Sequence, residues 1–273
     1  MVPLIWNDWA WHSEFAGAFW NMLSFVGTGL VIYKYLAKLG VGTLGQLVGV
    51  GVFAANKNIL YLQATAMTEP LLLFTMTAAC YYLLVWHENN NVLSLIKVAF
   101  WIMLATLTRY DGWFLLAYAT VLIVMEVWRT HGFKRVEGVS VLFLTLASLG
   151  ILLWFGWNQL IFSDALYFAF GPFSAHSQQL VMAEAGALPT RSNIWLSLKV
   201  YLYAFFYNSY TYPAILATLG AFALWWDRRI LAGARLATTA LLSPFFFNIL
   251  ALILGFSIFS EKPITFSGIP IVD

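Results

Sequence analysis

Long apolar runs separated by short polar segments make up most of this chain. Each run is continuous, which is typical of membrane-spanning helices and unlike the alternating pattern of membrane β-strands. A helix needs about 20 predominantly apolar residues to cross the hydrocarbon core of a bilayer. The pattern predicts about eight spans: Phe15–Leu36, Val41–Ala55, Glu69–Trp86, Leu93–Thr108, Tyr110–Trp128, Gly138–Asn158, Tyr210–Trp226 and Ala237–Phe256. By this measure Val41–Ala55 and Leu93–Thr108 are short for a full crossing.

One further apolar segment, Asn193–Tyr207, is interrupted by a lysine. We predict that it forms an interfacial or re-entrant helix rather than a span. In the second span, Gly42, Gly45 and Gly49 share one face, and small residues at this spacing let helices pack closely in lipid. The expected fold is an all-α polytopic membrane bundle that forms a single domain over residues 1–273.

Basic residues test this arrangement, because lysine and arginine are enriched in the cytoplasmic loops of membrane proteins. If Asn193–Tyr207 does not cross, every basic cluster falls on one side, which we predict to be cytoplasmic. The clusters are Lys34 with Lys38, then Lys97, then Arg129 with Lys134 and Arg135, then Arg228 with Arg229 and Arg235. Within the third cluster, Arg129 is the expected partner of Glu126.

The opposite side of the membrane collects the polar segments that carry few basic residues. These are Trp6–Glu14, Asn56–Glu69, the turn Arg109–Asp111 and Ile161–Asn193. Four segments far apart in the sequence thereby bring acids, an arginine, amides and aromatic side chains to one membrane face. Because ionisable residues in membrane segments are costly, we interpret this convergence as the main functional signal of the sequence.

Composition narrows the class of protein further. The chain is 62% hydrophobic and 10% charged, against about 25% charged residues in ordinary soluble domains. Its formal net charge is +2 without a basic stripe, so nucleic acid is not an expected partner. The one cysteine, Cys80, lies inside an apolar run, which excludes a disulfide framework. The histidines lack metal-ligand spacing, so we expect no dedicated metal site.

Glu69 stands where a polar segment meets a long apolar run, after Thr68 and before Pro70. Threonine is a good N-cap and proline fits the first helical turn, so a helix is expected to begin here. One interpretation is that Glu69 only complements the helix dipole. The other is that its carboxylate faces the polar segments and takes part in chemistry, and the two interpretations are compatible.

Arg109 and Asp111 join two apolar runs with almost no loop, which places both charges near the membrane surface. They either anchor two helix ends by snorkelling or, in the case of Arg109, contact a phosphate group, which suits the fork of donors on arginine. Asp8 lies among three tryptophans of the N-terminal segment. Those tryptophans form either a headgroup-level aromatic belt or a surface on which sugar rings stack.

Four stretches of sequence carry a family resemblance. Tyr61–Pro70 follows an asparagine-rich turn, Leu107–Trp113 contains the charged turn, and Asp164–Phe168 and Gly186–Thr190 belong to the long polar segment. Together they resemble membrane glycosyltransferases of the GT-C superfamily. The most similar type is the protein O-mannosyltransferase-like, family 39 group of bacteria and archaea.

The resemblance implies that a sugar on a polyprenyl phosphate is transferred to a hydroxyl of a protein, lipid or glycan acceptor on the non-cytoplasmic face. A carboxylate acts as general base, and positive groups stabilise the departing phosphate. Carried over to this chain, Glu69 and Asp8 are the catalytic candidates, and Arg109, Asp111 and Lys57 are expected at the donor phosphate. Sugar or acceptor contacts are expected from Asn58, Gln63, Tyr110, His176 and Gln178. No cofactor is implied, and assistance by a divalent cation stays open.

The chain departs from the family pattern at both ends. The superfamily carries its principal catalytic aspartate in the first outer loop, after a first membrane helix, whereas this chain starts with Met1–Trp6 and ends with Ser267–Asp273. We therefore expect a domain that is incomplete at both ends. Two other classes stay open: a transporter or flippase of lipid-linked or amphiphilic substrates, and a non-catalytic membrane subunit. The expected location is the prokaryotic cytoplasmic membrane, with several spans and the site facing outward.

Overall fold

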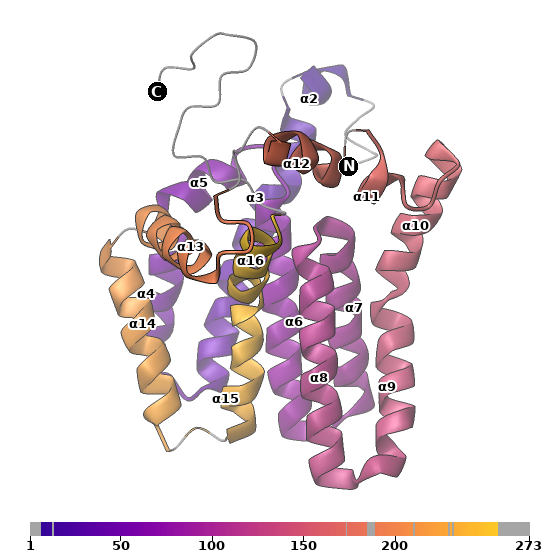
Figure 1. Ribbon diagram of the computed structural model, residues 1–273. Coiled ribbons are helices and arrows are strands. Elements are labelled where there is room, and N and C mark those ends of the chain that lie inside the picture. Colours follow the sequence, from indigo (N-terminus) through magenta and orange to yellow (C-terminus); the bar gives the residue numbers. More distant parts are fainter. Residues whose placement is uncertain are drawn as a thin grey trace. The chain divides into compact units, whose positions relative to one another are not determined.

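The computed structural model describes residues 7–12, 14–172, 174–184, 189–209, 211–228, 230 and 232–255 (Figure 1). Every regular element in these residues is a helix, which confirms the predicted all-α class. The helices are α2 (Asp8–His12), α3 (Phe15–Lys38), α4 (Thr43–Ala54), α5 (Lys57–Gln63), α6 (Glu69–Asn89), α7 (Val92–Thr108), α8 (Asp111–His131), α9 (Phe133–Ala147), α10 (Leu149–Phe162), α11 (Tyr167–Phe170), α12 (Ala175–Glu184), α13 (Ile194–Ser209), α14 (Thr211–Trp226), α15 (Ala232–Thr238), the 3₁₀ turn η1 (Thr239–Leu242) and α16 (Ser243–Leu254).

Five helical segments in the described residues are long and apolar enough to cross a membrane: Phe15–Lys38, Glu69–Asn89, Asp111–His131, Phe133–Phe162 and Gly233–Leu254. Three other predicted spans form the shorter apolar helices α4, α7 and α14, and the predicted interfacial segment forms α13. The 12 residues of α4 rise only about 18 Å, against roughly 30 Å for the hydrocarbon core. The count of eight spans therefore stays a prediction. Tyr210, the first residue of one predicted span, and Phe256, the last residue of another, lie outside the described residues.

The chain divides into two compact units, which are described separately. The first consists of Met1–Leu153 and Thr211–Pro244, and the second of Trp154–Tyr210 and Phe245–Asp273. All the functional residues predicted from the sequence belong to the first unit, except the two on α12. The expected single domain stays a prediction.

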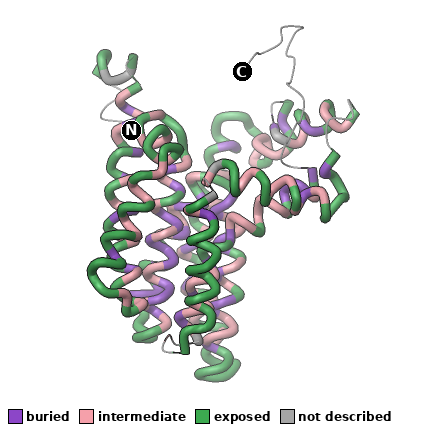
Figure 2. Tube along the Cα trace, turned by 90° about the vertical axis from the view of Figure 1, so that its left-hand side faces the viewer, coloured by how far each residue is buried: buried purple, intermediate pink, exposed green. Residues whose placement is uncertain are grey.

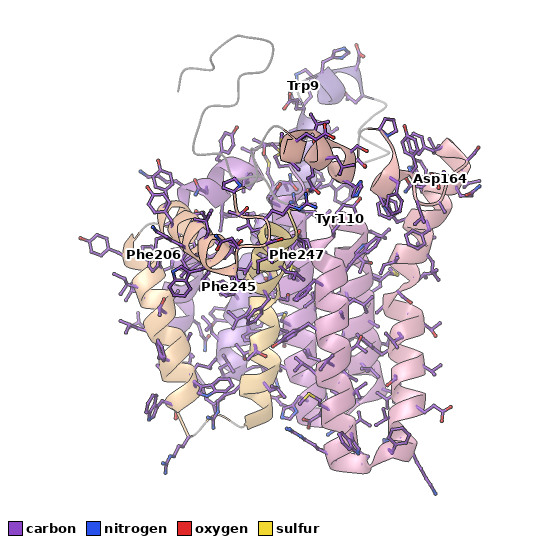
Figure 3. All side chains as sticks on the ribbon, viewed as in Figure 1. Trp9, Tyr110, Asp164, Phe206, Phe245 and Phe247 are labelled. Carbon is purple, nitrogen blue, oxygen red and sulfur yellow. The ribbon has the colours of Figure 1, made fainter. Side chains whose placement is uncertain are left out.

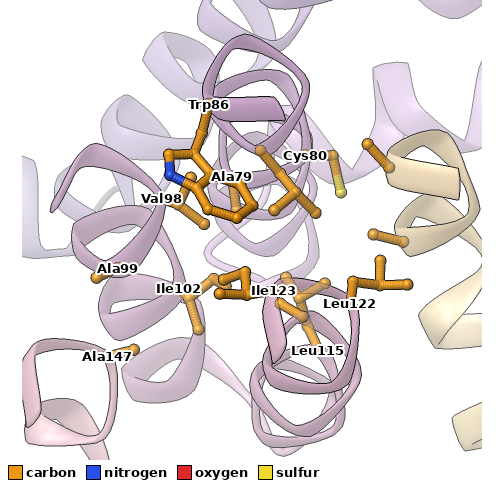
Figure 4. Close-up of a cluster of buried hydrophobic side chains, with 14 of the residues drawn as sticks. Ala79, Cys80, Trp86, Val98, Ala99, Ile102, Leu115, Leu122, Ile123 and Ala147 are labelled. Atoms are coloured by element: carbon orange, nitrogen blue, oxygen red, sulfur yellow. The ribbon is translucent and has the colours of Figure 1, made fainter. Parts of the chain in front are cut away.

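The core of the first unit lies between α6, α7 and α8, which pack against one another and against α3, α9 and α15. Many of its buried side chains are small, among them Ala105 and Ala119, and Figure 4 labels three others: Ala79, Ala99 and Ala147. Small residues let helix backbones approach closely in an apolar environment, where packing rather than the hydrophobic effect holds helices together. Large apolar side chains are also exposed, as is expected of lipid-facing helices, among them Val26, Leu44 and Val121. Figure 2 colours all exposed residues green along the backbone.

The predicted glycine face of α4 is correct only in part. A Cβ built on Gly42 meets nothing within 4 Å, whereas Gly49 packs against Leu36 of α3. A closer approach occurs at Gly112 in α8, where an added Cβ would overlap the backbone of Ala105 in α7. Glycine is therefore also required at a position that the sequence pattern did not mark.

Basic residues gather at the end of the first unit where α3, α6 and α8 finish. Lys38 and Glu88 form an ion pair between the ends of α3 and α6, with 2.5 Å between Nζ and Oε2. Arg129 lies in the last turn of α8. Because Glu69 and Asp111 begin α6 and α8, they lie at the opposite end. Lys38 and Arg129 therefore lie at the end of the first unit opposite Glu69 and Asp111, as predicted. Arg229 lies outside the described residues, and the cytoplasmic assignment stays a prediction.

Glu126 pairs with a residue that the sequence did not suggest. Its Oε1 atom lies 3.1 Å from Nδ1 of His87 on α6, instead of pairing with Arg129 as expected. Both side chains are 17% exposed, so this pair joins α6 to α8 in the interior of the first unit near its basic end.

Two tyrosine hydroxyls tie α15 and η1 to other helices. Tyr35 on α3 donates to Oγ1 of Thr238, and Tyr118 on α8 donates to Oγ1 of Thr239, each at 2.9 Å. Tyr35→Phe removes the first bond and is expected to lower the free energy of unfolding by about 1 kcal/mol. Denaturant titration in micelles measures this. Tyr33→Phe on the same helix is the control with no expected change, and an equal loss in both variants would contradict the assignment.

Candidate functional site

Three residues from two helix ends meet at the end of the first unit opposite its basic residues. Glu69 begins α6, Asp111 begins α8, and Arg109 lies in the short turn between α7 and α8. Nη1 of Arg109 lies 2.6 Å from Oε1 of Glu69, and its Nε lies 3.3 Å from Oδ2 of Asp111. We call Glu69, Arg109 and Asp111 the ion-pair cluster. It forms because α7 runs antiparallel to α6 and returns the chain to the level where α6 began.

Local sequence explains where these helices begin. Pro70 occupies the first turn of α6, where its missing N–H is not needed. Thr68 stands at the N-cap position as predicted, but its side chain makes no cap hydrogen bond. Its Oγ1 instead lies 3.5 Å from Nη1 of Arg109. The side chain of Thr68 is therefore directed at the arginine rather than at the helix backbone.

Burial differs within the ion-pair cluster. The side chain of Asp111 is 11% exposed, whereas those of Glu69 and Arg109 are 38% and 42% exposed. Asp111 is therefore the anchored partner, and it holds Nε of Arg109 from the start of α8. The Glu69–Arg109 pair faces solvent more, so its contribution to stability is expected to be small.

Two atoms of the ion-pair cluster have no hydrogen-bond partner among the described residues. Oε2 of Glu69 is buried and accepts from none of the described residues. Nη2 of Arg109 likewise donates to none of them. A carboxylate oxygen can take a proton from a hydroxyl within hydrogen-bond reach, and guanidinium donors bind phosphate oxygens. The arrangement can thus combine a general base with an anion-binding group.

The segment before the ion-pair cluster carries three of the other predicted residues. Lys57 and Asn58 begin α5 and are exposed, and Oδ1 of Asn56 caps this helix by accepting from the backbone N–H groups of Asn58 and Ile59. Gln63 ends α5 and is half-buried. Because α5 rises about 9 Å from its first to its last residue, Gln63 lies nearest to the turn that leads into α6.

Tyr110 and Asp8 also belong to the first unit. Tyr110, which is labelled in Figure 3, lies between Arg109 and Asp111. Its ring packs edge-on against Trp113, with 5.3 Å between ring centroids. Asp8 is 97% exposed on α2 and pairs with His12, whose Nδ1 lies 3.4 Å from its Oδ1. No described contact joins Asp8 to the ion-pair cluster, so its catalytic role stays a prediction.

His176 and Gln178 lie on α12 of the second unit, where the ring of His176 packs against Phe170. Their predicted roles at the sugar or acceptor stay predictions. The motif residues Gly186–Leu188 and the two ends of the chain, Met1–Trp6 and Ser267–Asp273, lie outside the described residues.

Asn21 is a site residue that sequence reasoning missed. It is 4% exposed on α3, and its Nδ2 donates to the backbone oxygens of Thr65, at 2.7 Å, and Met67. The signal was present, because an asparagine in the middle of the apolar run Phe15–Leu36 needs hydrogen-bond partners.

No group of three or more histidine, cysteine, aspartate or glutamate side chains that could hold a metal ion occurs in the described residues. Comparisons of the chain with protein-family models, with curated proteins and with solved structures find no match. The family resemblance therefore rests on the sequence stretches Tyr61–Pro70, Leu107–Trp113, Asp164–Phe168 and Gly186–Thr190.

Proposed function

We propose that this protein is a membrane glycosyltransferase that moves a sugar from a polyprenyl-phosphate donor to an acceptor hydroxyl. The observation that carries the proposal is the ion-pair cluster. An inverting sugar transfer needs a base beside the acceptor hydroxyl and a positive group beside the departing phosphate. Glu69 and Arg109 offer one of each, 2.6 Å apart, at the beginning of α6.

In the proposed reaction, the carboxylate of Glu69 takes the proton of the acceptor hydroxyl while the hydroxyl oxygen attacks the anomeric carbon of the sugar. The bond between that carbon and the phosphate oxygen breaks, and its electron pair stays with the phosphate. Arg109 stabilises the resulting negative charge. Asp111 positions Arg109 through the 3.3 Å contact to its Nε. Lys57 supplies a second positive charge beside the donor phosphate. Asp8 stays a second catalytic candidate. Contacts to the sugar or acceptor are proposed for five residues: Asn58, Gln63, Tyr110, His176 and Gln178.

The distribution of charge favours an enzyme over a transporter. A transporter is expected to place ionisable residues near the middle of the bilayer, in broken helices. In the described part of the first unit, charged side chains lie toward helix ends, as at Glu69, Arg109, Lys38 and Glu88. Under this proposal the cluster faces outward from a prokaryotic cytoplasmic membrane, since the basic residues occupy the other end.

Photo-crosslinking of the protein in nanodiscs with a diazirine analogue of polyprenyl phosphate tests the proposal. We expect label in peptides around Glu69 and Arg109. Arg109→Ala is expected to reduce this labelling about tenfold, because charge-assisted hydrogen bonds to the phosphate are lost. Arg129→Ala removes a matched arginine at the basic end and is expected to change nothing. Labelling confined to the Arg129–Arg135 end, or unaffected by Arg109→Ala, would overturn the proposal.

A further inference from the structure

The face of α3 that carries Gly17 and Asn21 meets the turn Ala64–Met67, which leads into the ion-pair cluster. We propose that Gly17 and Asn21 are positioning residues that hold this turn, and through it Glu69, in place for reaction. The inference rests on the proposed function for the role of Glu69. The contacts that hold the turn stand independently of that function.

The side chain of Asn21 reaches out of its own helix. Its amide nitrogen donates to the carbonyl groups of Thr65 and Met67, which lie two residues apart in the turn. Other buried polar residues on α3 satisfy themselves locally: the hydroxyl of Ser24 donates to the carbonyl of Trp20, and that of Thr28 to the carbonyl of Ser24. Asn21 thus differs from its neighbours in fixing a segment more than 40 residues away in the sequence.

Gly17 lies one helical turn before Asn21 and on the same face of α3. A Cβ at this position would stand 2.5 Å from Cβ of Ala66 and 3.1 Å from its Cα. Only glycine lets α3 come this close to the turn, and this close approach brings the amide of Asn21 within reach of both carbonyls. The two residues therefore act together, Gly17 by leaving space and Asn21 by hydrogen bonding.

The turn Ala64–Met67 determines the position of both residues that Nη1 of Arg109 contacts, Thr68 and Glu69. Met67 is followed directly by Thr68 and Glu69, and both side chains lie against Nη1 of Arg109. A shift of the turn moves Thr68 and the first residue of α6 together. Loosening the turn is therefore expected to disturb the geometry of Glu69 without reaching the core between α6, α7 and α8.

Hydrogen–deuterium exchange with Gly17→Ala and Asn21→Leu tests whether these residues hold the turn. Both variants are expected to raise amide exchange in the segment Ala64–Thr68 about tenfold, with no change in the middle of α6. The double variant is expected to do little more than either single variant, because both disrupt one contact. Ser24→Ala, which removes a buried hydroxyl bonded within α3, is the matched control. Unchanged exchange in Gly17→Ala and Asn21→Leu would overturn the proposal.

Carbodiimide labelling followed by mass spectrometry reports on Glu69 itself, with Glu88 as an internal reference. Labelling of Glu69 relative to Glu88 is expected to rise severalfold in both variants, as its carboxylate loses its fixed place beside Arg109. Sugar transfer is expected to show a kcat about tenfold lower with little change in KM for the donor, since binding is kept and alignment is lost. Faster exchange without any change at Glu69 would overturn the positioning role. If the unmodified protein transfers no sugar, the proposed function fails while exchange and labelling still decide the positioning role.

Discussion

Replacing Glu69 with glutamine is expected to reduce sugar transfer by a factor of about 10² to 10⁴, the range typical of a lost general base. Glutamine has the same shape and its carbonyl oxygen can still accept the 2.6 Å hydrogen bond from Arg109. It cannot take the proton of the acceptor hydroxyl. The loss is therefore expected in kcat, with KM for the donor nearly unchanged, and transfer of a radiolabelled sugar in nanodiscs measures both.

Glu88→Gln is the matched control for this substitution. Glu88 pairs with Lys38 at the basic end, and its side chain is 30% exposed. Its replacement is expected to leave transfer unchanged and to cost less than about 1 kcal/mol of stability, as for exposed ion pairs. If Glu69→Gln transfers sugar as fast as the unmodified protein, or if both variants lose activity equally, Glu69 is not the base.

The arrangement of the ion-pair cluster could be predicted in outline from the sequence. Hydropathy and Pro70 marked where α6 begins, and the near-absence of a loop at Arg109 marked the turn between α7 and α8. Counting the apolar runs then places Glu69 and Arg109 at the same end of neighbouring helices. The ion pair between them confirms that they meet, because an antiparallel hairpin leaves little choice of partner at a helix end.

Contacts along the sides of helices could not be predicted in this way. Which residues of two helices touch depends on the rotation of each helix about its axis and on which helices are neighbours, and apolar runs encode neither. Glu126 was expected beside Arg129, three residues away in the sequence, but it pairs with His87 on another helix. The partners of Asn21 could not be predicted for the same reason, since Thr65 and Met67 are distant from it in the sequence.

The two predicted catalytic acids, Asp8 and Glu69, differ in the contacts that hold their side chains in place. Asp8 and Glu69 look alike in the sequence, each an acid in a polar segment next to an apolar run. Among the described residues, Asp8 contacts only His12 within the five residues of α2, whereas Glu69 is held by Arg109, which Asp111 anchors in turn. A general base needs a fixed position relative to its substrate. Glu69 is therefore the stronger of the two candidates.

Gly112→Ala is expected to destabilise the first unit by about 3 kcal/mol, at the upper end of the usual cost of overpacking. An added Cβ would overlap the carbonyl group of Ala105 and crowd the backbone nitrogen of Thr106. Backbone atoms cannot move aside as a flexible side chain can, so α7 and α8 must separate. Denaturant unfolding in micelles measures the loss. Gly138→Ala in α9, where a Cβ meets nothing within 4 Å, is the matched control and is expected to gain up to about 1 kcal/mol.

The same substitution is expected to impair the ion-pair cluster even in molecules that remain folded. Gly112 directly follows Asp111, and its backbone N–H bonds to the carbonyl of Arg109 at 3.0 Å. Separation of α7 from α8 therefore shifts Asp111 relative to Arg109 and weakens the contact that anchors the guanidinium. Crosslinking of the donor analogue to folded Gly112→Ala should fall along with stability, whereas Gly138→Ala should label normally. Normal stability in Gly112→Ala would show that the close approach of α7 and α8 is dispensable, and normal crosslinking in this variant would show that it does not determine the position of Arg109.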